Sequence, residues 1–580
     1  MPVRVVLRHD GEWRLFAAPR RVIQATTPDE VIAAMRDVEA AVTTGLHAAG
    51  FVCYEAARGF DAALRTLPCG SLPLVWFGLF ESFELVPAPS KTTGSEPIDW
   101  LLATNIEDYR QRLLAIRDAL ADGRSYQVNH TERLVVDHLD TASLFAQVAA
   151  DAPYAALIET DTFTIVSASP ELFFDLRATT IVCKPMKGTA ARALTSAADR
   201  ERAQWLSTSI KNRAENVMIT DMVRNDLGRI ARVGSVRVTD LFAVQRLRNV
   251  WQMTSTVSAM TDASITEIFL ALFPGASVTG APKASSMSII STLESTPREI
   301  YTGAIGYIGP DRHARFSIAI RTAWTNRASA RATYGAGGGI VWDSSPDEEF
   351  DELLVKTNVV RSAAEPAFAL LETLLWTPAA GWFLLRQHLD RLSTSADYFA
   401  FLFDERAVLK TLDELVDTAE VALRVRLTLG RSGEVSVTSQ VFSPSPMQVA
   451  EIRLVRGWVE TTDVLMFHKT THRTRYDAAG AGSEVLLVNA TGAVTESTIA
   501  NIVFRWRGER YTPPIEDGLL PGTFRAWMLE LGIVQERSLH EEEFSEIDEL
   551  LLVNALRGVR KVERVLTPEG KVLFERSRAV

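Results

Sequence analysis

Two lysines stand in contexts where an amine could act as a nucleophile or tether a cofactor. Lys187 lies in KPMKGTAAR, and Lys469 lies in FHKTTHRTRYD. A deprotonated amine can attack an electrophilic carbon or form a Schiff base with a carbonyl compound. Taken singly, a lysine before glycine is usually a turn residue, and a lysine in a basic loop is usually a surface residue. The residues around each lysine therefore decide between these interpretations.

Candidate catalytic or metal-binding carboxylates occur in three other segments of residues 165–358. Glu171 lies in SASPELFF, Glu215 in KNRAENVMITDMVRNDLGR, and Glu349 and Glu352 in DEEFDELLVK. A single glutamate on a helix or at the start of a strand is usually solvated.

Two glycine-rich runs shift the balance towards a functional site. They are FPGASVTGAPK, from Phe273 to Lys283, and YGAGGGI, from Tyr334 to Ile340. Three consecutive glycines let backbone N–H groups approach a bound anion closely. A flexible turn explains the run less well, because an apolar strand is expected to follow at once.

The bulk composition narrows the class of protein. The chain has 580 residues and a net charge of −11, with Lys and Arg scattered along it. This length predicts two or more domains, and the absence of a basic stripe argues against nucleic acid as a partner. No apolar run is long enough for a membrane span, and the N-terminus is charged too early for a secretory signal. Three scattered cysteines suit neither a disulfide framework nor a zinc site, so a cytoplasmic location is expected.

Two linker-like stretches divide the chain. Residues 86–97 are rich in Pro, Ser, Thr and Gly, and residues 361–367 are small and polar. Helices are predicted around Tyr109–Leu120 and Glu215–Val223, and strands at Glu171–Leu176, Thr179–Cys183 and Leu423–Leu429. The predicted domains are residues 1–360, of which 1–95 are the less specific part, a linker at 361–367, and residues 368–580.

The first domain resembles the chorismate-utilising family, which includes anthranilate synthase component I, aminodeoxychorismate synthase component I, and the isochorismate and salicylate synthases. The resemblance covers roughly residues 100–360. It rests on an ordered set of motifs: SPELF, PMKGT, AENVMITDMVRNDLGR, PGASVTGAPK, REIYTGAIGYIG, IRTAW and GAGGGIVWDSSPDEE. It implies an α+β fold of layered β-sheets and helices, with chorismate as the substrate.

The resemblance also implies roles for individual residues. Glu215 and Glu352 would hold Mg²⁺, with Glu349 acting through water. Glu171 would protonate the departing C4 hydroxyl, and Lys187 would be the nucleophile. The residues implied in binding the substrate are Arg321, Gly280, Lys283, Gly337, Gly338, Gly339 and Lys356.

Lys187 favours an aminodeoxychorismate synthase within this family, because anthranilate synthases usually carry alanine there. It does not by itself exclude the isochorismate-type enzymes. Two positions depart from the common pattern. Ala276 replaces a glycine, and Gln252 stands where several relatives carry a histidine linked to pyruvate elimination. No cysteine lies in a glutaminase-like elbow, so a separate glutamine amidotransferase subunit is implied as the ammonia source.

The second domain resembles the fold-type IV pyridoxal-phosphate enzymes, an α/β class that includes branched-chain and D-amino-acid aminotransferases and aminodeoxychorismate lyase. The resemblance rests on FALLETLLW, LRQHLDRL, FHKTTHRTRYD, VTESTIANIVF and GLLPGTFR. It implies that Lys469 tethers pyridoxal phosphate and moves a proton, and that Glu496 faces the pyridine nitrogen. Arg391, Gly522 and Thr523 would hold the phosphate, and the NALRG segment would line the substrate side.

Together the two resemblances predict a bifunctional enzyme of folate biosynthesis that makes 4-aminobenzoate. The alternative is an anthranilate- or isochorismate-type synthase fused to a true aminotransferase. A homodimer through the second domain is compatible with either interpretation.

Overall fold

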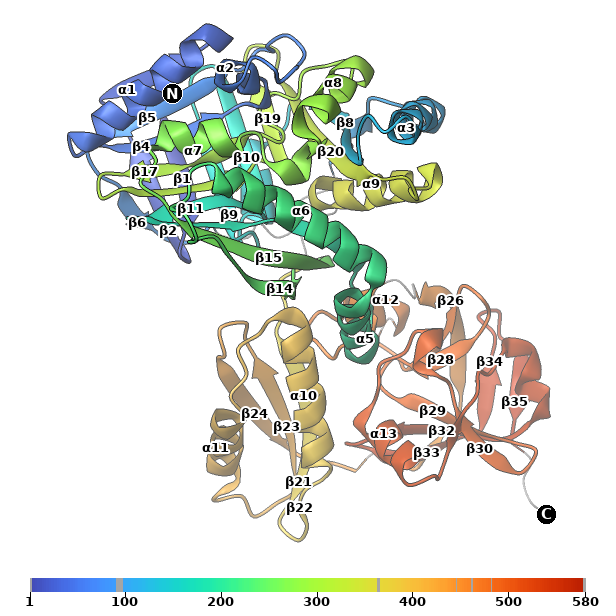
Figure 1. Cartoon of the computed structure of the whole chain (residues 1–580). Helices are drawn as coiled ribbons and strands as arrows, with labels where there is room; N and C mark the ends of the chain where they lie inside the picture. Colours follow the sequence, from blue (N-terminus) through green and yellow to red (C-terminus); the bar gives the residue numbers. More distant parts are fainter. Residues whose placement is uncertain are drawn as a thin grey trace. The chain divides into compact units, whose positions relative to one another are not determined.

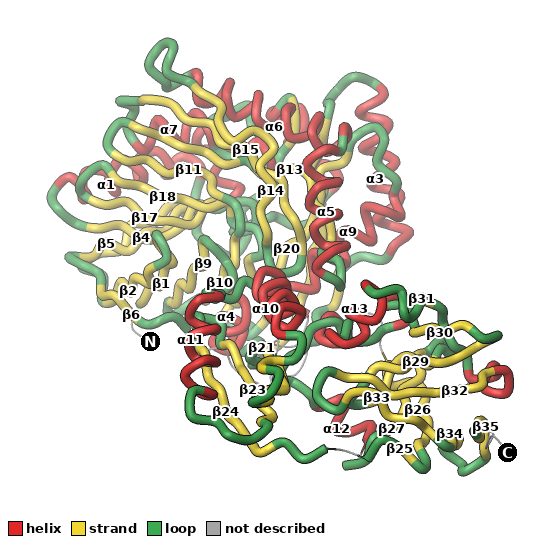
Figure 2. The backbone as a smooth tube through the Cα atoms, turned by 90° about the horizontal axis from the view of Figure 1, so that it is seen from below, coloured by secondary structure: helices red, strands yellow, loops and turns green. Residues whose placement is uncertain are grey.

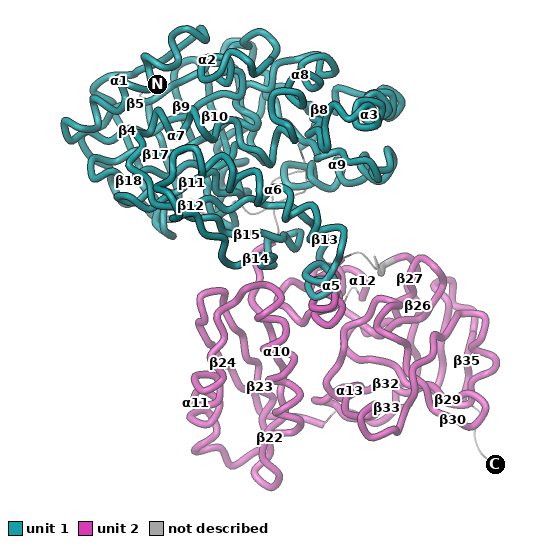
Figure 3. The backbone as a smooth tube through the Cα atoms, viewed as in Figure 1, with its two compact units in different colours: residues 1–192, 202–365 teal, residues 193–201, 366–580 magenta. Residues whose placement is uncertain are grey.

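The computed structural model describes residues 3–89, 98–361, 366–444, 446–459, 463–480 and 482–576. The chain forms two compact units (Figure 3). Unit 1 comprises residues 1–192 and 202–365, and unit 2 comprises residues 193–201 and 366–580. Both predicted linkers fall partly outside the described residues.

Unit 1 contains two antiparallel ten-stranded sheets. The first runs β16-β8-β20-β19-β10-β9-β1-β2-β6, with β7 also paired to β8. Its strands are β1 (Arg4–His9), β2 (Glu12–Ala17), β6 (Glu84–Val86), β7 (Leu101–Leu102), β8 (Gln127–Asp137), β9 (Tyr154–Glu159), β10 (Phe163–Ser169), β16 (Gly280–Ala281), β19 (Thr322–Asn326) and β20 (Arg331–Ile340). The second runs β13-β15-β12-β11-β18-β17-β4-β5-β3, with β14 also paired to β15. Its strands are β3 (Arg21–Ala25), β4 (His47–Val52), β5 (Val75–Phe80), β11 (Leu172–Arg177), β12 (Thr180–Lys184), β13 (Met186–Ala191), β14 (Arg237–Arg246), β15 (Val250–Met260), β17 (Ala304–Gly309) and β18 (His313–Ile318).

Unit 1 has four layers: two sheets pack against each other, and helices cover the outer face of each sheet. Three hydrophobic clusters lie between these layers. One cluster lies between the sheets and joins residues such as Phe16 and Ile165 to Phe51 and Ile305. The second sheet packs its other face on α1 and α7, and the first sheet packs on α3, α4 and α9 (Figure 1). The helices are α1 (Val31–Thr43), α2 (Ala57–Phe60), α3 (Ile106–Ala121), α4 (Thr141–Val148), α6 (Ile210–Gly228), α7 (Ile265–Leu272), α8 (Lys283–Leu293) and α9 (Pro346–Arg361). Helix α5 (Ser196–Thr208) begins in residues of unit 2 and ends in residues of unit 1.

Unit 2 consists of a small and a large sheet, each with its own helices (Figure 2). The small sheet runs β22-β21-β23-β24, and α10 and α11 cover one face of it. The elements of this part are β21 (Leu370–Thr377), β22 (Gly381–Trp382), α10 (Leu385–Phe399), α11 (Glu405–Val416), β23 (Leu423–Leu429) and β24 (Val435–Val441).

The large sheet of unit 2 has eleven strands and mixed parallel and antiparallel pairing. Its main order is β25-β33-β32-β29-β28-β27-β26-β34-β35, and β30 pairs with both β29 and β31. Its elements are β25 (Gln448–Val449), β26 (Ile452–Val459), α12 (Thr474–Gly480), β27 (Val485–Asn489), β28 (Val494–Ser497), β29 (Asn501–Trp506), β30 (Glu509–Thr512), α13 (Thr523–Glu530), β31 (Gln535–Glu536), β32 (Ile547–Asn554), β33 (Gly558–Val562), β34 (Arg564–Leu566) and β35 (Val572–Glu575).

The local elements predicted from the sequence are confirmed. The predicted helices correspond to α3 and α6, and the predicted hairpin corresponds to the antiparallel pair β11 and β12. The predicted strand Leu423–Leu429 coincides with β23. Among the described residues, no helix combines the length and the apolar character needed to span a membrane.

Two candidate active sites

Lys187 lies at the centre of the first candidate site. It belongs to β13, and its side chain is only 15% exposed. Its Nζ atom lies 3.8 Å from Oε2 of Glu215 on α6. Asn216 on the same helix donates a hydrogen bond of 3.1 Å to the Lys187 carbonyl, so α6 fixes the backbone that carries the amine. The structure thus brings together Lys187 and Glu215, which lie in two different sequence motifs.

Glu171 is buried at the start of β11 and is suited to hold a proton. Its carboxylate accepts hydrogen bonds from the Ser277 hydroxyl at 2.6 Å and from the Met186 amide at 3.4 Å. Burial raises its pKa to about 7, and the nearby charge of Lys187 partly opposes this rise. A carboxyl group with this pKa is protonated in a useful fraction at neutral pH, as a general acid requires.

The two predicted carboxylates of α9 lie in different environments. Burial raises the pKa of Glu349, whose Oε1 accepts a 2.7 Å hydrogen bond from Ser344. The amine of Lys356 lies 2.6 Å from Glu352 and lowers the pKa of that carboxylate. Lys187 interacts electrostatically with both carboxylates, so α9 also faces the first site.

The three glycines Gly337, Gly338 and Gly339 lie within β20 and pair with β8, so the run is a strand rather than a flexible turn. A Cβ atom at Gly339 would lie 2.4 Å from Nζ of Lys187, and one at Gly338 would lie 3.2 Å from Oε2 of Glu349. A side chain at Gly339 would therefore displace the Lys187 amine or the Gln127 amide, because the strand passes directly beside them. The strand forms one wall of the site.

Arg321 is an enclosed cation near Tyr334 of β20. Burial lowers its pKa, and the nearby phenol of Tyr334 partly opposes this shift. Within the described part of the chain, the Arg321 guanidinium makes no hydrogen bond or ion pair with another side chain. Such a group suits a substrate carboxylate, because burying an unpaired charge is otherwise unfavourable.

Three other predicted substrate residues have clear structural contacts. Lys356 donates a 2.8 Å hydrogen bond to the Gly337 carbonyl, in addition to its contact with Glu352. Lys283 is half-buried and donates hydrogen bonds to Asp226 at 3.0 Å and to the Leu272 carbonyl at 3.1 Å. Gly280 has φ +144°, and a Cβ there would lie 2.1 Å from the carbonyl of Gln127. Their contacts with substrate stay predictions, and those of Lys283 would have to compete with Asp226.

Sequence reasoning missed the role of two glutamines. Gln127 is fully buried on β8, and neither of its amide atoms has a hydrogen-bond partner among the described residues. It lies next to Gly339 and hence beside Lys187. Gln252 donates to the Gly188 carbonyl at 2.8 Å and accepts from Thr189 at 3.1 Å, which holds the Lys187 strand. The one sequence signal for Gln127 is that a polar residue stands at a strand position expected to be buried.

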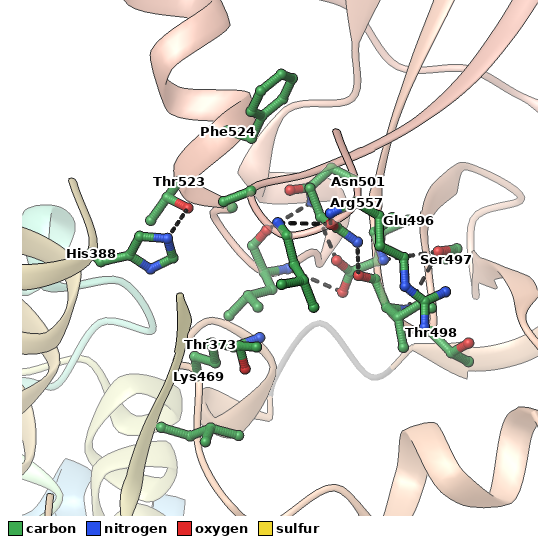
Figure 4. A pocket seen from close by; sticks show the side chains of 18 of the residues that line it. Thr373, His388, Lys469, Glu496, Ser497, Thr498, Asn501, Thr523, Phe524 and Arg557 are labelled. Atoms are coloured by element: carbon green, nitrogen blue, oxygen red, sulfur yellow. Dashed lines mark hydrogen bonds between the residues drawn. The ribbon is translucent and has the colours of Figure 1, made fainter. Parts of the chain in front are cut away.

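The second candidate site is a pocket in unit 2 with a cavity volume of about 200 Å³ (Figure 4). Lys469 lines it, between β26 and α12, and its enclosure by protein lowers the pKa of the amine to about 8. The charge of Arg391 lowers this pKa further, whereas Glu372 and Glu496 raise it. The amine is therefore far easier to deprotonate than an ordinary lysine.

Glu496 lies at the end of the pocket on β28 and is buried (Figure 4). Its Oε1 accepts hydrogen bonds from the Tyr476 hydroxyl at 2.8 Å and the Leu520 amide at 3.1 Å, and its Oε2 accepts one from Asn501 at 3.2 Å. Burial raises its pKa to about 7 against the effect of these bonds. One oxygen thus keeps acceptor capacity for a donor in the pocket.

Arg391 is engaged by a residue that the sequence analysis did not single out. Its Nε and Nη2 donate to buried Glu372 at 2.8 and 2.6 Å, and its Nη1 donates to the Pro521 carbonyl at 3.1 Å. Glu372 also lies 2.6 Å from Nδ1 of His388. Arg391 and the hydrogen-bonded His388 hold the pKa of Glu372 at about 2 despite the opposing effect of burial. The predicted role of Arg391 as a phosphate ligand would use its remaining N–H groups.

The predicted phosphate cradle lies where α13 begins. Gly522 is the N-cap of α13 and Thr523 its first residue, and both line the pocket. The Thr523 hydroxyl lies 3.4 Å from Nε2 of His388 (Figure 4). Asn554 and Arg557 from the NALRG segment also line the pocket, as expected from the sequence.

The residues of the second site fit pyridoxal phosphate. The pocket combines an amine of lowered pKa, a buried carboxylate with a spare acceptor, and a helix start with Arg391 beside it. The first site offers carboxylates of the kind that Mg²⁺ prefers. Within the described ranges, however, no three His, Cys, Asp or Glu residues are grouped to hold a metal ion.

Comparisons with known proteins match the two parts of the chain to two different families. Residues 81–362 match the family model of chorismate binding enzymes, and residues 369–565 match that of amino-transferase class IV. Aminodeoxychorismate synthase component 1 of Klebsiella aerogenes is 38% identical over 282 residues, which cover 47% of this chain and 62% of the relative. The protein of the same name in Escherichia coli K12 is 36% identical over 290 residues, covering 49% of this chain and 63% of the relative. The chain thus spans less than two thirds of the length of these curated relatives.

Solved structures establish the fold of the first part. Anthranilate synthase component I of Streptococcus pneumoniae TIGR4 superposes with a TM-score of 0.51 at 22% identity, covering 63% of this chain and 91% of that one. The menaquinone-specific isochorismate synthase of Escherichia coli gives a TM-score of 0.50 at 19% identity, covering 62% and 88%. The expected fold classes of both domains, and both family resemblances, are confirmed.

Proposed function

We propose that this chain, which joins a chorismate-binding enzyme domain to an amino-transferase class IV domain, makes 4-aminobenzoate from chorismate in two steps. The first site would aminate chorismate to 4-amino-4-deoxychorismate. The second would eliminate pyruvate from that product. The relatives named aminodeoxychorismate synthase support the first step, and the amino-transferase domain with its lysine pocket supports the second.

In the first step, Lys187 would attack C2 of the chorismate ring while Glu171 protonates the C4 hydroxyl, which leaves as water. Ammonia would then add at C4 and expel the lysine from C2. The enclosed guanidinium of Arg321 and the β20 wall would hold the substrate carboxylates. Glu215 and Glu352, with Glu349 nearby, would hold Mg²⁺, which neutralises carboxylate charge when it is bound.

In the second step, the pocket residues would bind pyridoxal phosphate, which supplies an electron sink conjugated to the substrate amine. Glu496 would accept a hydrogen bond from the pyridine nitrogen, and Arg391, Gly522 and Thr523 would hold the phosphate. The Lys469 amine would remove the proton from C4 of the substrate. The C3–O bond then breaks, enolpyruvate leaves and becomes pyruvate, and the ring becomes aromatic.

The ammonia would come from a separate glutamine amidotransferase, since the component 1 relatives bear a name that implies a second component. The cytoplasmic location and the homodimer through the second domain stay predictions. The alternative, an anthranilate- or isochorismate-type synthase joined to a true aminotransferase, predicts a different first product and a requirement for an amino donor.

The observation that carries the proposal is the presence on one chain of two enclosed lysines, Lys187 beside Glu171 and Lys469 beside Glu496. The test is product analysis after incubation of the pure chain with chorismate, ammonia, Mg²⁺ and pyridoxal phosphate. The proposal predicts 4-aminobenzoate and pyruvate in equal amounts. Anthranilate or isochorismate as the product would support the alternative.

A further inference from the structure

Two arginines lie side by side on the pocket face of the small sheet in unit 2. Arg424 and Arg426 alternate along β23 with Leu423, Val425 and Leu427, which pack into the core under α10 and α11. Strand alternation therefore turns both guanidiniums away from that core. Both arginines line the pocket that contains Lys469, and both are exposed.

A third arginine lines the same pocket from the large sheet. Arg557 lies in the turn between β32 and β33, where Asn554 accepts hydrogen bonds from the amides of Leu556 and Arg557 at 3.1 and 2.7 Å. These bonds fix the turn. Burial lowers the pKa of Arg557, and the charges of Arg560 and Arg424 lower it further, whereas Glu484 partly opposes this shift. Arg424 and Arg557 therefore lie within electrostatic reach of each other.

Among the described residues, no carboxylate forms an ion pair with any of these three guanidiniums, although Glu484 interacts electrostatically with Arg557. Across the described part of unit 2, none of the three makes a side-chain hydrogen bond or ion pair. The nearby carboxylate of Glu484 is engaged by Arg560 through two hydrogen bonds of 2.7 Å.

The residues paired across the strands with Arg424 and Arg426 are uncharged. Arg424 pairs with Leu375 and Gln440, and Arg426 pairs with Thr373 and Thr438. Three like charges around one pocket are unfavourable unless an anion binds among them.

The pocket's other groups account for the cofactor, so these arginines are left for the substrate. The predicted phosphate cradle is formed by Gly522, Thr523 and Arg391, and Arg391 is already balanced by Glu372. A substrate amino acid of an ordinary aminotransferase carries one carboxylate, for which one arginine suffices. The cyclohexadiene that the proposed function delivers carries two, one on the ring and one on the enolpyruvyl ether.

We propose that Arg424, Arg426 and Arg557 form a dicarboxylate-binding site that selects the doubly charged cyclohexadiene over amino acids with one carboxylate. This inference rests on the proposed function of the second domain. These specificity-determining residues lie on β23 and in the turn between β32 and β33, and all three line the pocket. A site with this preference would favour lyase chemistry, because the doubly charged cyclohexadiene is the substrate that can become aromatic.

The first experiment measures binding without turnover. The full chain loaded with pyridoxal phosphate is titrated with 3-(carboxymethoxy)benzoate, which carries two carboxylates in a similar arrangement, and with 3-methoxybenzoate, which carries one. The visible absorption of the bound cofactor reports the second site alone. The dicarboxylate should bind the wild type more tightly, and Arg424→Gln, Arg426→Gln and Arg557→Gln should each weaken it about tenfold or more. Binding of the monocarboxylate should change less.

The matched control is Arg406→Gln, which removes one charge from exposed α11 outside the pocket. Its dicarboxylate affinity should equal that of the wild type. The affinity of all variants for pyridoxal phosphate should also be unchanged. Loss of cofactor affinity with an intact dicarboxylate preference would instead assign the arginines to the cofactor phosphate and overturn the proposal.

The second experiment separates this inference from the proposed function. Steady-state release of 4-aminobenzoate from aminodeoxychorismate should show a KM raised about tenfold or more in each variant, with a smaller effect on kcat. A wild-type chain that releases no 4-aminobenzoate would remove the proposed function. Unchanged KM and unchanged probe affinity in all three variants, with normal wild-type turnover, would overturn the arginine site alone.

Discussion

Substitution of Glu496 by glutamine isolates the charge that faces the cofactor ring. In the wild type, Oε1 already accepts hydrogen bonds from Tyr476 and Leu520, so Oε2 is the oxygen available to a pyridine N–H. A glutamine carbonyl can keep the bonds from Tyr476 and Leu520. Its amide group would then face Asn501 Nδ2, which is also a donor, and would offer no acceptor to the ring.

The expected magnitude follows from the loss of one hydrogen bond to a charged group. Such a bond contributes about 1.5–3 kcal/mol, which corresponds to roughly a 10- to 150-fold change in affinity. At pH 8 the wild-type carboxylate is ionised, because its pKa is about 7. The affinity of Glu496→Gln for pyridoxal phosphate should therefore fall by that factor at pH 8.

The assay is an absorption titration of the cofactor-free chain with pyridoxal phosphate at pH 8. Glu530→Gln, which neutralises an exposed carboxylate on α13, is the matched control and should bind like the wild type. Equal affinities for Glu496→Gln and the wild type would refute the assignment of Glu496 to the ring nitrogen.

Three further predictions concern the first site. Lys187→Ala should abolish amination of chorismate while release of 4-aminobenzoate from supplied aminodeoxychorismate continues, and normal amination by this variant would exclude the nucleophile. Glu215→Gln and Glu352→Gln should each raise the Mg²⁺ concentration needed for half-maximal amination, and unchanged Mg²⁺ titrations would contradict the metal assignment. Because Glu171 must be protonated and its pKa is about 7, amination should decline as the pH rises above about 7. Glu171→Gln should lower the rate by about 10²–10⁴-fold, and a rate that keeps increasing to pH 9 in the wild type would argue against this acid.

Local structure in this chain follows closely from sequence periodicity. The apolar spacing of Tyr109, Leu113 and Ile116 predicts α3, and the alternation in Leu423–Leu429 predicts β23 to the residue. Gly522 and Thr523, which the resemblance implies as phosphate ligands, lie where α13 begins. These features depend on neighbours a few residues apart, which the sequence displays directly.

Contacts between segments far apart in the chain could not be predicted from the sequence pattern. The alternation in β23 gives one apolar and one polar face, but only the fold turns Arg424 and Arg426 towards the pocket of Lys469. The bond between Arg391 and Glu372 joins a helix to a strand 19 residues away. The close approach of Gly339 to the Lys187 amine depends on the position of β20 in the fold, which the sequence does not display.

The most direct test of the two-site account is a comparison of Lys469→Ala with the wild type, supplied with chorismate, ammonia, Mg²⁺ and pyridoxal phosphate. The wild type should release 4-aminobenzoate. The variant should lose the visible absorption of the bound cofactor, convert chorismate at the wild-type rate and accumulate aminodeoxychorismate, because Lys187 and Glu171 lie in the other unit. Normal 4-aminobenzoate release by the variant, or no accumulation of the aminated product, would contradict the account.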